Sequence, residues 1–224
     1  MADYIPALAQ ASPDLFGVAI AGVHGQVAGV GDSAHPFTIQ SVAKPFLFAL
    51  VCEALGHREV RHRLGVNATG LPFDSVMAVE LATEGLTNPM VNSGAIATTS
   101  LAPGRTATLA DGGVNPVTHR RVVSEDTCRR TLALMLTAGM YERSGEWLYE
   151  IGLPAKSGVS GGIITIAPGK GGLATFSPPL DPAGNSVRGQ LVTKLLSEAL
   201  GLDILASSPV PEAPKLQTSR SPLV

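Results

Sequence analysis

Hydrophobic and small residues form short alternating runs near both ends of the chain, separated by glycine, proline and polar residues. Runs of this length with a period of two are typical of β-strands. The pattern predicts two hairpins, one formed by residues 16–22 (FGVAIAG) with 26–30 (QVAGV) and the other by residues 160–167 (SGGIITIA) with 172–177 (GLATFS). The sequence PGKG at residues 168–171 is a suitable turn for the second hairpin.

The segments between and after the hairpins carry apolar residues at helical spacing, with residues that start and stop helices beside them. Serine and asparagine cap a helix because their side chains accept a free backbone N–H, and glycine ends a helix because it adopts a left-handed conformation. Four helices are predicted: residues 41–55 ending at Gly56, a helix opened by Asn88 and Pro89 that continues as MVNSGAIATT, a helix from Ser124 to Gly139, and a last helix introduced by Asn185 and stopped by Gly201.

The order of these elements predicts an α/β protein of the α+β type. Strands from both chain ends would form one antiparallel sheet, and helices would flank it. We expect a single domain over residues 15–205, an N-terminal extension over residues 1–14, and a disordered proline-rich tail over residues 206–224.

Composition narrows the class of protein further. With 224 residues, 45% of them hydrophobic and 15% charged, the chain is long enough and apolar enough to bury a core. A net charge of −2 gives no excess of positive charge that would indicate binding to nucleic acid or to an anionic membrane. No apolar run approaches the roughly 20 residues of a membrane span, and the opening segment lacks the profile of a signal peptide. We therefore expect a soluble cytoplasmic protein.

Cysteine and histidine give no sign of a disulfide or a metal site. Cys52 and Cys128 both fall within apolar helical patterns, which favours packed free thiols. The five histidines show no clustered ligand spacing apart from His57 and His62, which we place on a polar helix face. We expect no bound metal.

A serine and a lysine lie three residues apart at Ser41-Val42-Ala43-Lys44, the start of the first predicted helix. Residues at this spacing share a helix face, so Lys44 Nζ can reach Ser41 Oγ. A buried lysine can lose its proton near neutral pH and act as a base for the hydroxyl. The alternative is that Ser41 caps the helix and Lys44 extends to solvent. A chain of this size contains about one such motif by chance.

A rarer motif, Lys156-Ser157-Gly158, lies just before the second hairpin and arises by chance in about one chain in ten. An S-x-x-K motif followed later by K-[ST]-G on a strand is the signature of serine-acylating β-lactamases and penicillin-binding proteins. A strand carrying the triplet beside the serine helix would supply a positive charge and a backbone N–H. That N–H and the N–H of Ser41 would form an oxyanion hole.

Five longer segments are more specific evidence of a family than these two short motifs. IQSVAKPF, NPMVNSGAIATTSL, TLADGGVNPVTHRRV, LTAGMYERSGEWLYEIGLPAKSGVSGGI and FSPPLDPAGNSVRGQ together resemble the serine-dependent glutaminase family, over about residues 15 to 205. The resemblance implies a β-lactamase-like or transpeptidase-like fold and hydrolysis of L-glutamine to L-glutamate and ammonia without a cofactor. It also implies a homo-oligomer, a homotetramer in the family.

The same resemblance assigns roles to single residues. Ser41 matches the family nucleophile and Lys44 its base, while Asn92, Tyr141 and Val159 match residues that contact substrate, Val159 through its backbone. An asparagine donor and acceptor and a tyrosine hydroxyl suit a substrate with charged and amide groups. Without the resemblance, an asparagine satisfied by helix packing and a tyrosine that anchors a loop would be favoured.

One departure from the family is large. Only APGRTAT, residues 102–108, connects the NSGAIA helix to the ADGG segment, where the family has a helical segment of several dozen residues. The missing segment carries a substrate-binding glutamate and asparagine and a tyrosine near the serine, so the helical subdomain is truncated. Three hypotheses follow: an active glutaminase, a non-catalytic glutaminase-like scaffold, or an acyl hydrolase that acts on a β-lactam or peptide.

Overall fold

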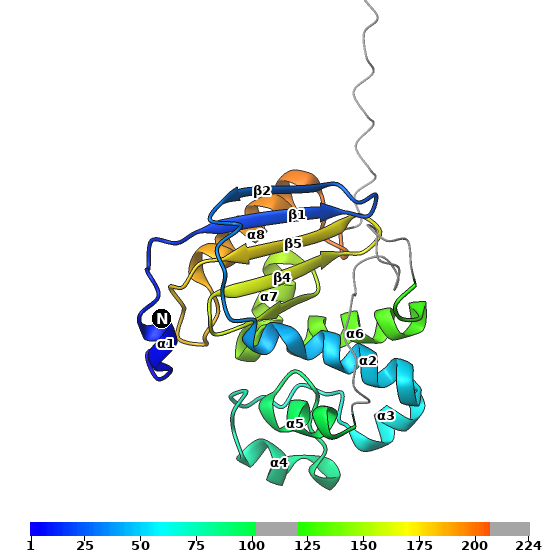
Figure 1. Cartoon of the computed structure of the whole chain (residues 1–224). Helices are drawn as coiled ribbons and strands as arrows, with labels where there is room; N and C mark the ends of the chain where they lie inside the picture. Colours follow the sequence, from blue (N-terminus) through cyan, green and yellow to red (C-terminus); the bar gives the residue numbers. More distant parts are fainter. Residues whose placement is uncertain (102–120, 207–224) are drawn as a thin grey trace, which may run out of the picture.

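The computed structural model describes residues 1–101 and 121–206. Its centre is a five-stranded sheet in the order β2-β1-β5-β4-β3, with every adjacent pair antiparallel (Figure 1). The strands are β1 (Gly17–Gly22), β2 (Val27–Gly31), β3 (Ala155–Ser157), β4 (Gly162–Ala167) and β5 (Gly171–Phe176). The predicted α/β fold with a sheet built from both chain ends is therefore confirmed, because β1 pairs with β5.

Helices surround this sheet. The α-helices are α1 (Pro6–Ala9), α2 (Lys44–Leu55), α3 (His57–Arg63), α4 (Met77–Leu81), α5 (Asn92–Ser100), α6 (Glu125–Ala138), α7 (Ser144–Ile151) and α8 (Val187–Leu200). Short 3-10 helices are η1 (Gln40–Ala43), η2 (Thr83–Gly85) and η3 (Tyr141–Arg143).

Strand β4 is apolar on both of its faces, because helices pack against each of them. Ile166 joins a buried cluster with residues of α2 and α6, whereas Ile163 joins a second cluster with Trp147 and Ile151 of α7. In Figure 1, α7 and α8 accordingly lie behind the sheet, and α2 and α6 lie on its other side. The site described below is built around η1, which contacts β3, and the first turn of α2.

Two of the predicted helix starts are confirmed and two are displaced. The Ser124 side chain accepts the Thr127 N–H at the start of α6, and η1 leads directly into α2, which ends at Gly56. Asn88 does not begin a helix: its Oδ1 accepts the Met90 N–H at 2.9 Å, which holds a local turn, and α5 begins at Asn92. The cap of α8 is Ser186 rather than its neighbour Asn185.

The N-terminal residues pack against the body of the protein. Ala2 and Leu8 are buried in one cluster with Tyr141 and Val159, two of the residues predicted to contact substrate. The predicted disordered tail falls, from residue 207 onward, outside the described residues.

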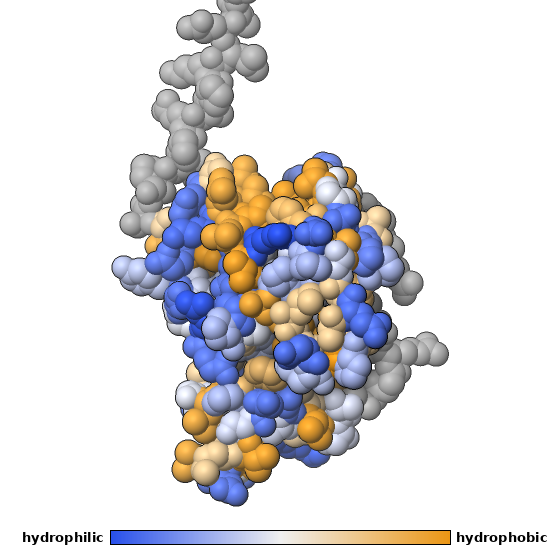
Figure 2. Space-filling model, turned by 90° about the vertical axis from the view of Figure 1, so that its left-hand side faces the viewer, coloured by the Kyte–Doolittle hydropathy of each residue, from blue (hydrophilic) through white to orange (hydrophobic). Residues whose placement is uncertain are grey.

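Apolar side chains are exposed on α4 and α5. Ile96 of α5 is 72% exposed, and Val76 and Leu81 at the two ends of α4 are 75% and 72% exposed. Figure 2 shows apolar groups at the lower end of the molecule, at the height of α4 in Figure 1, and a second apolar area at the level of the sheet and α8. No helix in the described ranges is long and apolar enough to cross a membrane. Nor do the described residues bring together three potential metal-binding side chains.

Candidate functional site

Ser41 lies in η1, one turn before α2, and is half-buried. Its side chain caps neither η1 nor α2. Instead, its hydroxyl interacts with the Tyr141 side chain and favours a lower pKa of that tyrosine. The structure therefore does not support the capping alternative and places the serine hydroxyl among polar groups.

Lys44 is the first residue of α2 and points inward. Its Nζ donates to Asn92 Oδ1 at 2.8 Å and to the Met90 carbonyl oxygen at 3.3 Å, so it does not extend to solvent. Burial lowers the pKa of Lys44 to about 8, because a low-dielectric environment disfavours the charged form. The predicted hydrogen bond from Lys44 to Ser41 is absent among the described residues, since the Lys44 ammonium is directed toward α5.

Asn92 joins α5 to Lys44 through its side-chain oxygen. It is the first residue of α5, and its backbone N–H donates to the Phe73 carbonyl oxygen at 2.8 Å. Close packing holds the start of this helix in place: a Cβ on Gly94 would lie 2.0 Å from the Asn88 carbonyl oxygen. Asn92 is thus engaged with the lysine of the site rather than only with neighbouring helix residues.

A second lysine, Lys156 of β3, is completely buried. Its Nζ donates to the carbonyl oxygens of Gly139 at 2.9 Å and Ser157 at 2.7 Å, and it lies 4.1 Å from the centre of the Tyr141 ring. Its pKa is well below the usual range, first because of burial and second because of the nearby Lys44 charge. The charge of Lys44 therefore affects the pKa of Lys156, although no hydrogen bond joins the two side chains.

Tyr141 is the residue that joins the serine to the second lysine. Its hydroxyl donates to the Ser157 carbonyl oxygen at 3.0 Å, and its ring stacks at a tilt on Phe73 with 4.5 Å between centroids. Burial raises its pKa, while the contact with Ser41 opposes that rise. Its backbone has a φ of 56°, a left-handed conformation that costs a non-glycine residue about 1 kcal/mol or more. The fold thus maintains backbone strain at a residue that faces Ser41.

The strand that carries the Lys-Ser-Gly triplet lies against η1, as predicted. A Cβ on Gly158 would lie 3.2 Å from the Ile39 carbonyl oxygen and 3.2 Å from Val42 Cγ2, so a larger residue here would push a neighbouring atom away by a few tenths of an ångström. Val159 follows and is buried. Within the described residues, neither the Val159 N–H nor the Ser41 N–H donates a hydrogen bond.

A cavity of about 140 Å³ adjoins the Tyr141 side of this cluster. Phe73, Asn88, Val91 and Glu142 are among its other lining residues. Phe73 and Asn88 were not predicted as site residues. Phe73 gave no signal because it lies in an irregular segment, and Asn88 was interpreted as a helix cap.

The cysteines do not belong to the site. Cys52 and Cys128 are free and buried, and burial raises the pKa of their thiols to about 12 and about 11. The prediction of packed free thiols is confirmed, and neither is a reactive thiolate near neutral pH.

Comparison with known proteins identifies the family. A family model described as Glutaminase matches residues 1–108 and 104–205. Glutaminase 2 of Yersinia pestis is 44% identical to this chain, with 92% of this chain and 84% of that protein covered. Glutaminase of Colwellia psychrerythraea is 36% identical, with 91% and 90% covered.

Comparison with solved structures leads to the same family. A structure titled probable glutaminase ybaS superposes with a TM-score of 0.87 at 35% identity and covers 91% of both chains. A Bacillus glutaminase structure has a TM-score of 0.80 at 25% identity, with 89% of this chain and 95% of that chain covered. The fold is therefore the β-lactamase-like fold of these glutaminases.

The alignments also locate the missing segment. The match to the Yersinia pestis protein extends over 285 positions, although this chain has only 224 residues, so that protein contains residues that this one lacks. The family model matches in two pieces that meet between residues 104 and 108, within the short connection APGRTAT. With its truncated centre, the chain belongs to the glutaminase family.

Proposed function

We propose that this protein hydrolyses L-glutamine to L-glutamate and ammonia through an acyl-enzyme on Ser41. The observation that carries the proposal is the convergence of Ser41, Lys44, Tyr141 and the Lys-Ser-Gly strand. The proposal is supported by a hydroxyl that interacts with Tyr141, a lysine with a pKa of about 8, and two backbone N–H groups that have no hydrogen-bond acceptor among the described residues. Membership of the glutaminase family supports the choice of substrate.

In the proposed reaction, neutral Lys44 removes the proton of Ser41 while Oγ forms a bond to the carboxamide carbon of glutamine. The N–H groups of Ser41 and Val159 stabilise the resulting oxyanion. The carbon–nitrogen bond then breaks, and Lys44 returns the proton to the leaving ammonia. Water attacks the acyl-enzyme with Lys44 again as base, and glutamate leaves as the Ser41 hydroxyl is restored.

The remaining assignments concern substrate and assembly. We assign contacts with substrate to the side chains of Asn92 and Tyr141 and to the backbone of Val159. Asn92 already binds Lys44, so a substrate carboxylate or amide near Asn92 would also lie near the base. The domain over residues 15–205, a homo-oligomeric state and a cytoplasmic location are further parts of the proposal, and it includes no metal or cofactor.

The shortened centre favours a second candidate. Because the resemblance places a substrate-binding glutamate and asparagine in the segment that this chain lacks, the protein is also a candidate for a glutaminase-like scaffold without turnover. An acyl hydrolase of the β-lactamase or peptidase type is a third candidate. The nearby relatives named as glutaminases argue against it.

The deciding experiment is ammonia release from L-glutamine by purified protein, with Ser41→Ala as the control and size-exclusion chromatography as the test of folding. Ser41→Ala is expected to lower the rate by several powers of ten, because the members of an acylating group act as a unit. A folded wild-type protein with no release that depends on Ser41 would contradict the proposal and support the scaffold. Release of β-lactam or peptide products alone would support the third candidate.

A further inference from the structure

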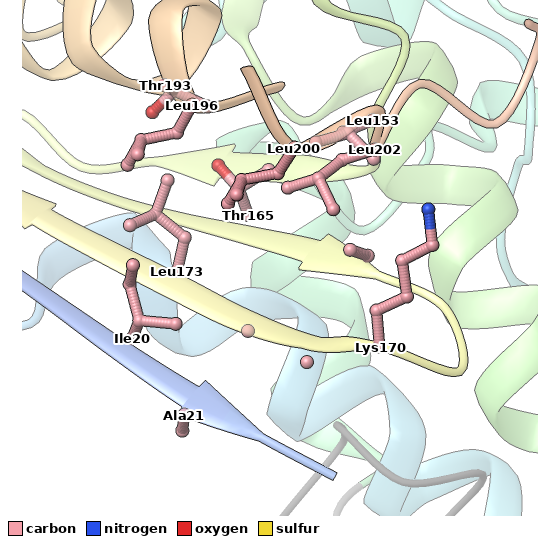
Figure 3. A pocket seen from close by; sticks show the side chains of 13 residues that line it. Ile20, Ala21, Leu153, Thr165, Lys170, Leu173, Thr193, Leu196, Leu200 and Leu202 are labelled. Carbon is pink, nitrogen blue, oxygen red and sulfur yellow. The ribbon is translucent and has the colours of Figure 1, made fainter. Parts of the chain in front are cut away.

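A separate apolar channel of about 290 Å³ lies between α8 and the face of the sheet opposite α2. Figure 3 shows Ile20 and Leu173 on one wall, Leu196 and Leu200 of α8 on the other, and Leu202 near one end. Ser41 and its neighbours do not line this channel. Its volume is close to the lower limit for binding pockets of small molecules.

Lys170 lies at one end of the channel, beyond Leu202 in Figure 3. It is exposed, its Nζ donates to the Gly201 carbonyl oxygen at 2.7 Å, and it forms no ion pair within the described part of the chain. A lysine ammonium that donates one hydrogen bond to a carbonyl has two further N–H donors for an anion. The channel therefore has a positive charge at one end and a hydrocarbon wall along its length.

Two threonines, Thr165 and Thr193, also line the channel, and the Thr193 hydroxyl donates to the Gly189 carbonyl oxygen at 2.7 Å. Thr165 differs from it. Its side chain is on the face of β4 that faces α8, since Thr165 pairs with Leu173 across the strands, and the residue is 2% exposed. Its Oγ1 has no hydrogen-bond partner among the described residues. Figure 3 places Thr165 between the Lys170 end and the Leu196 end. Buried hydroxyl groups normally have a partner, so an unpaired one in a channel indicates a place for a polar atom of a ligand.

We propose that this channel binds a medium-chain aliphatic carboxylate that carries a hydroxyl group on its chain. The carboxylate pairs with Lys170, the hydrocarbon chain lies along the leucines, and the ligand hydroxyl pairs with Thr165. The order of cation, hydroxyl and apolar end along the channel matches the order of groups in such a molecule. Charge and polarity thus distinguish this occupant from an uncharged lipid or from an apolar surface of a second copy.

The test is displacement of a fluorescent dansyl fatty acid from the full chain by three competitors: 3-hydroxydecanoate, decanoate and decan-1-ol. The hydroxy acid is expected to bind at least threefold more tightly than decanoate, and decanoate at least tenfold more tightly than the alcohol. Lys170→Met should remove the preference for carboxylate over alcohol. Thr165→Val, which preserves shape, should remove the preference for the hydroxy acid and leave decanoate binding in place.

A blocking variant and its matched control test the location. Leu200→Trp should fill the channel and abolish displaceable binding, whereas Leu191→Trp, an exposed position on the same helix that does not line the channel, should not. Both positions are exposed, so both variants should fold. Equal binding of all three competitors, or unchanged binding in Leu200→Trp, would overturn the proposal. So would sedimentation showing that Leu200→Trp separates an oligomer, because the channel would then be an interface.

Discussion

Lys44 Nζ donates a 2.8 Å hydrogen bond to Asn92 Oδ1, which joins the first residue of α2 to the first residue of α5. The two residues are 48 positions apart, and each begins a helix. The acceptor of this hydrogen bond is neutral. Burial, rather than a nearby opposite charge, therefore determines the pKa shift of Lys44, the proposed base.

We first predict the pH dependence of ammonia release. Lys44 must be neutral to accept the Ser41 proton, and burial lowers its pKa to about 8. The value of kcat/KM should therefore rise with pH, about tenfold per unit below pH 8, and level off above it. A profile of kcat/KM between pH 6 and 10 measures this. A plateau that extends below pH 7 would exclude Lys44 as the base.

Asn92→Asp should move that profile to higher pH. A carboxylate beside the ammonium favours the charged form of Lys44, so its pKa should rise by about one unit or more. The value of kcat/KM at pH 7 should then fall by about tenfold or more and recover partly in alkaline solution. Asn92→Ala is the control, because it removes the amide without adding charge and should lower activity without that alkaline recovery.

Gly158→Ala should slow the reaction by misplacing the proposed oxyanion donors. Its added Cβ would lie 3.2 Å from the Ile39 carbonyl oxygen, so the backbone at residue 158 or at Ile39 must shift by a few tenths of an ångström. We expect kcat to fall by roughly 10-fold to 100-fold, because reaction rates depend steeply on such positions. Gly145→Ala, in a part of α7 where a Cβ meets no atom within 4 Å, should leave kcat unchanged. Equal effects of the two changes would contradict this account.

Tyr141→Phe should lower both activity and stability. The variant loses the hydrogen bond to the Ser157 carbonyl oxygen and the polar contact with Ser41. The free energy of unfolding should fall by about 1 kcal/mol, and kcat should fall by about tenfold or more. Urea denaturation and steady-state kinetics measure the two effects. The matched change Tyr149→Phe, at a tyrosine that is 88% exposed, should alter neither quantity.

The sequence predicted the sheet and the longer helices because their apolar periodicity and end signals are local. It misplaced the start of α5 because Asn88 uses its side chain in a turn, which the sequence cannot distinguish from a helix cap. Ser41 and Lys156 could be recognised by their spacing within motifs. The direction of Lys44 and the packing of Ala2 beside Tyr141 depend on tertiary contacts between distant segments, for which the sequence contains no local signal.

The pairing of β1 with β5 has a consequence for how this family tolerates changes in length. The N-terminal piece, residues 1–101, and the C-terminal piece, residues 121–206, are fastened together by that pairing and by the contact of α2 with α6. The stretch that connects them is therefore a site where evolution can lengthen or shorten the polypeptide without cutting the sheet. By the same logic, the two pieces expressed as separate polypeptides should reassemble into one protein.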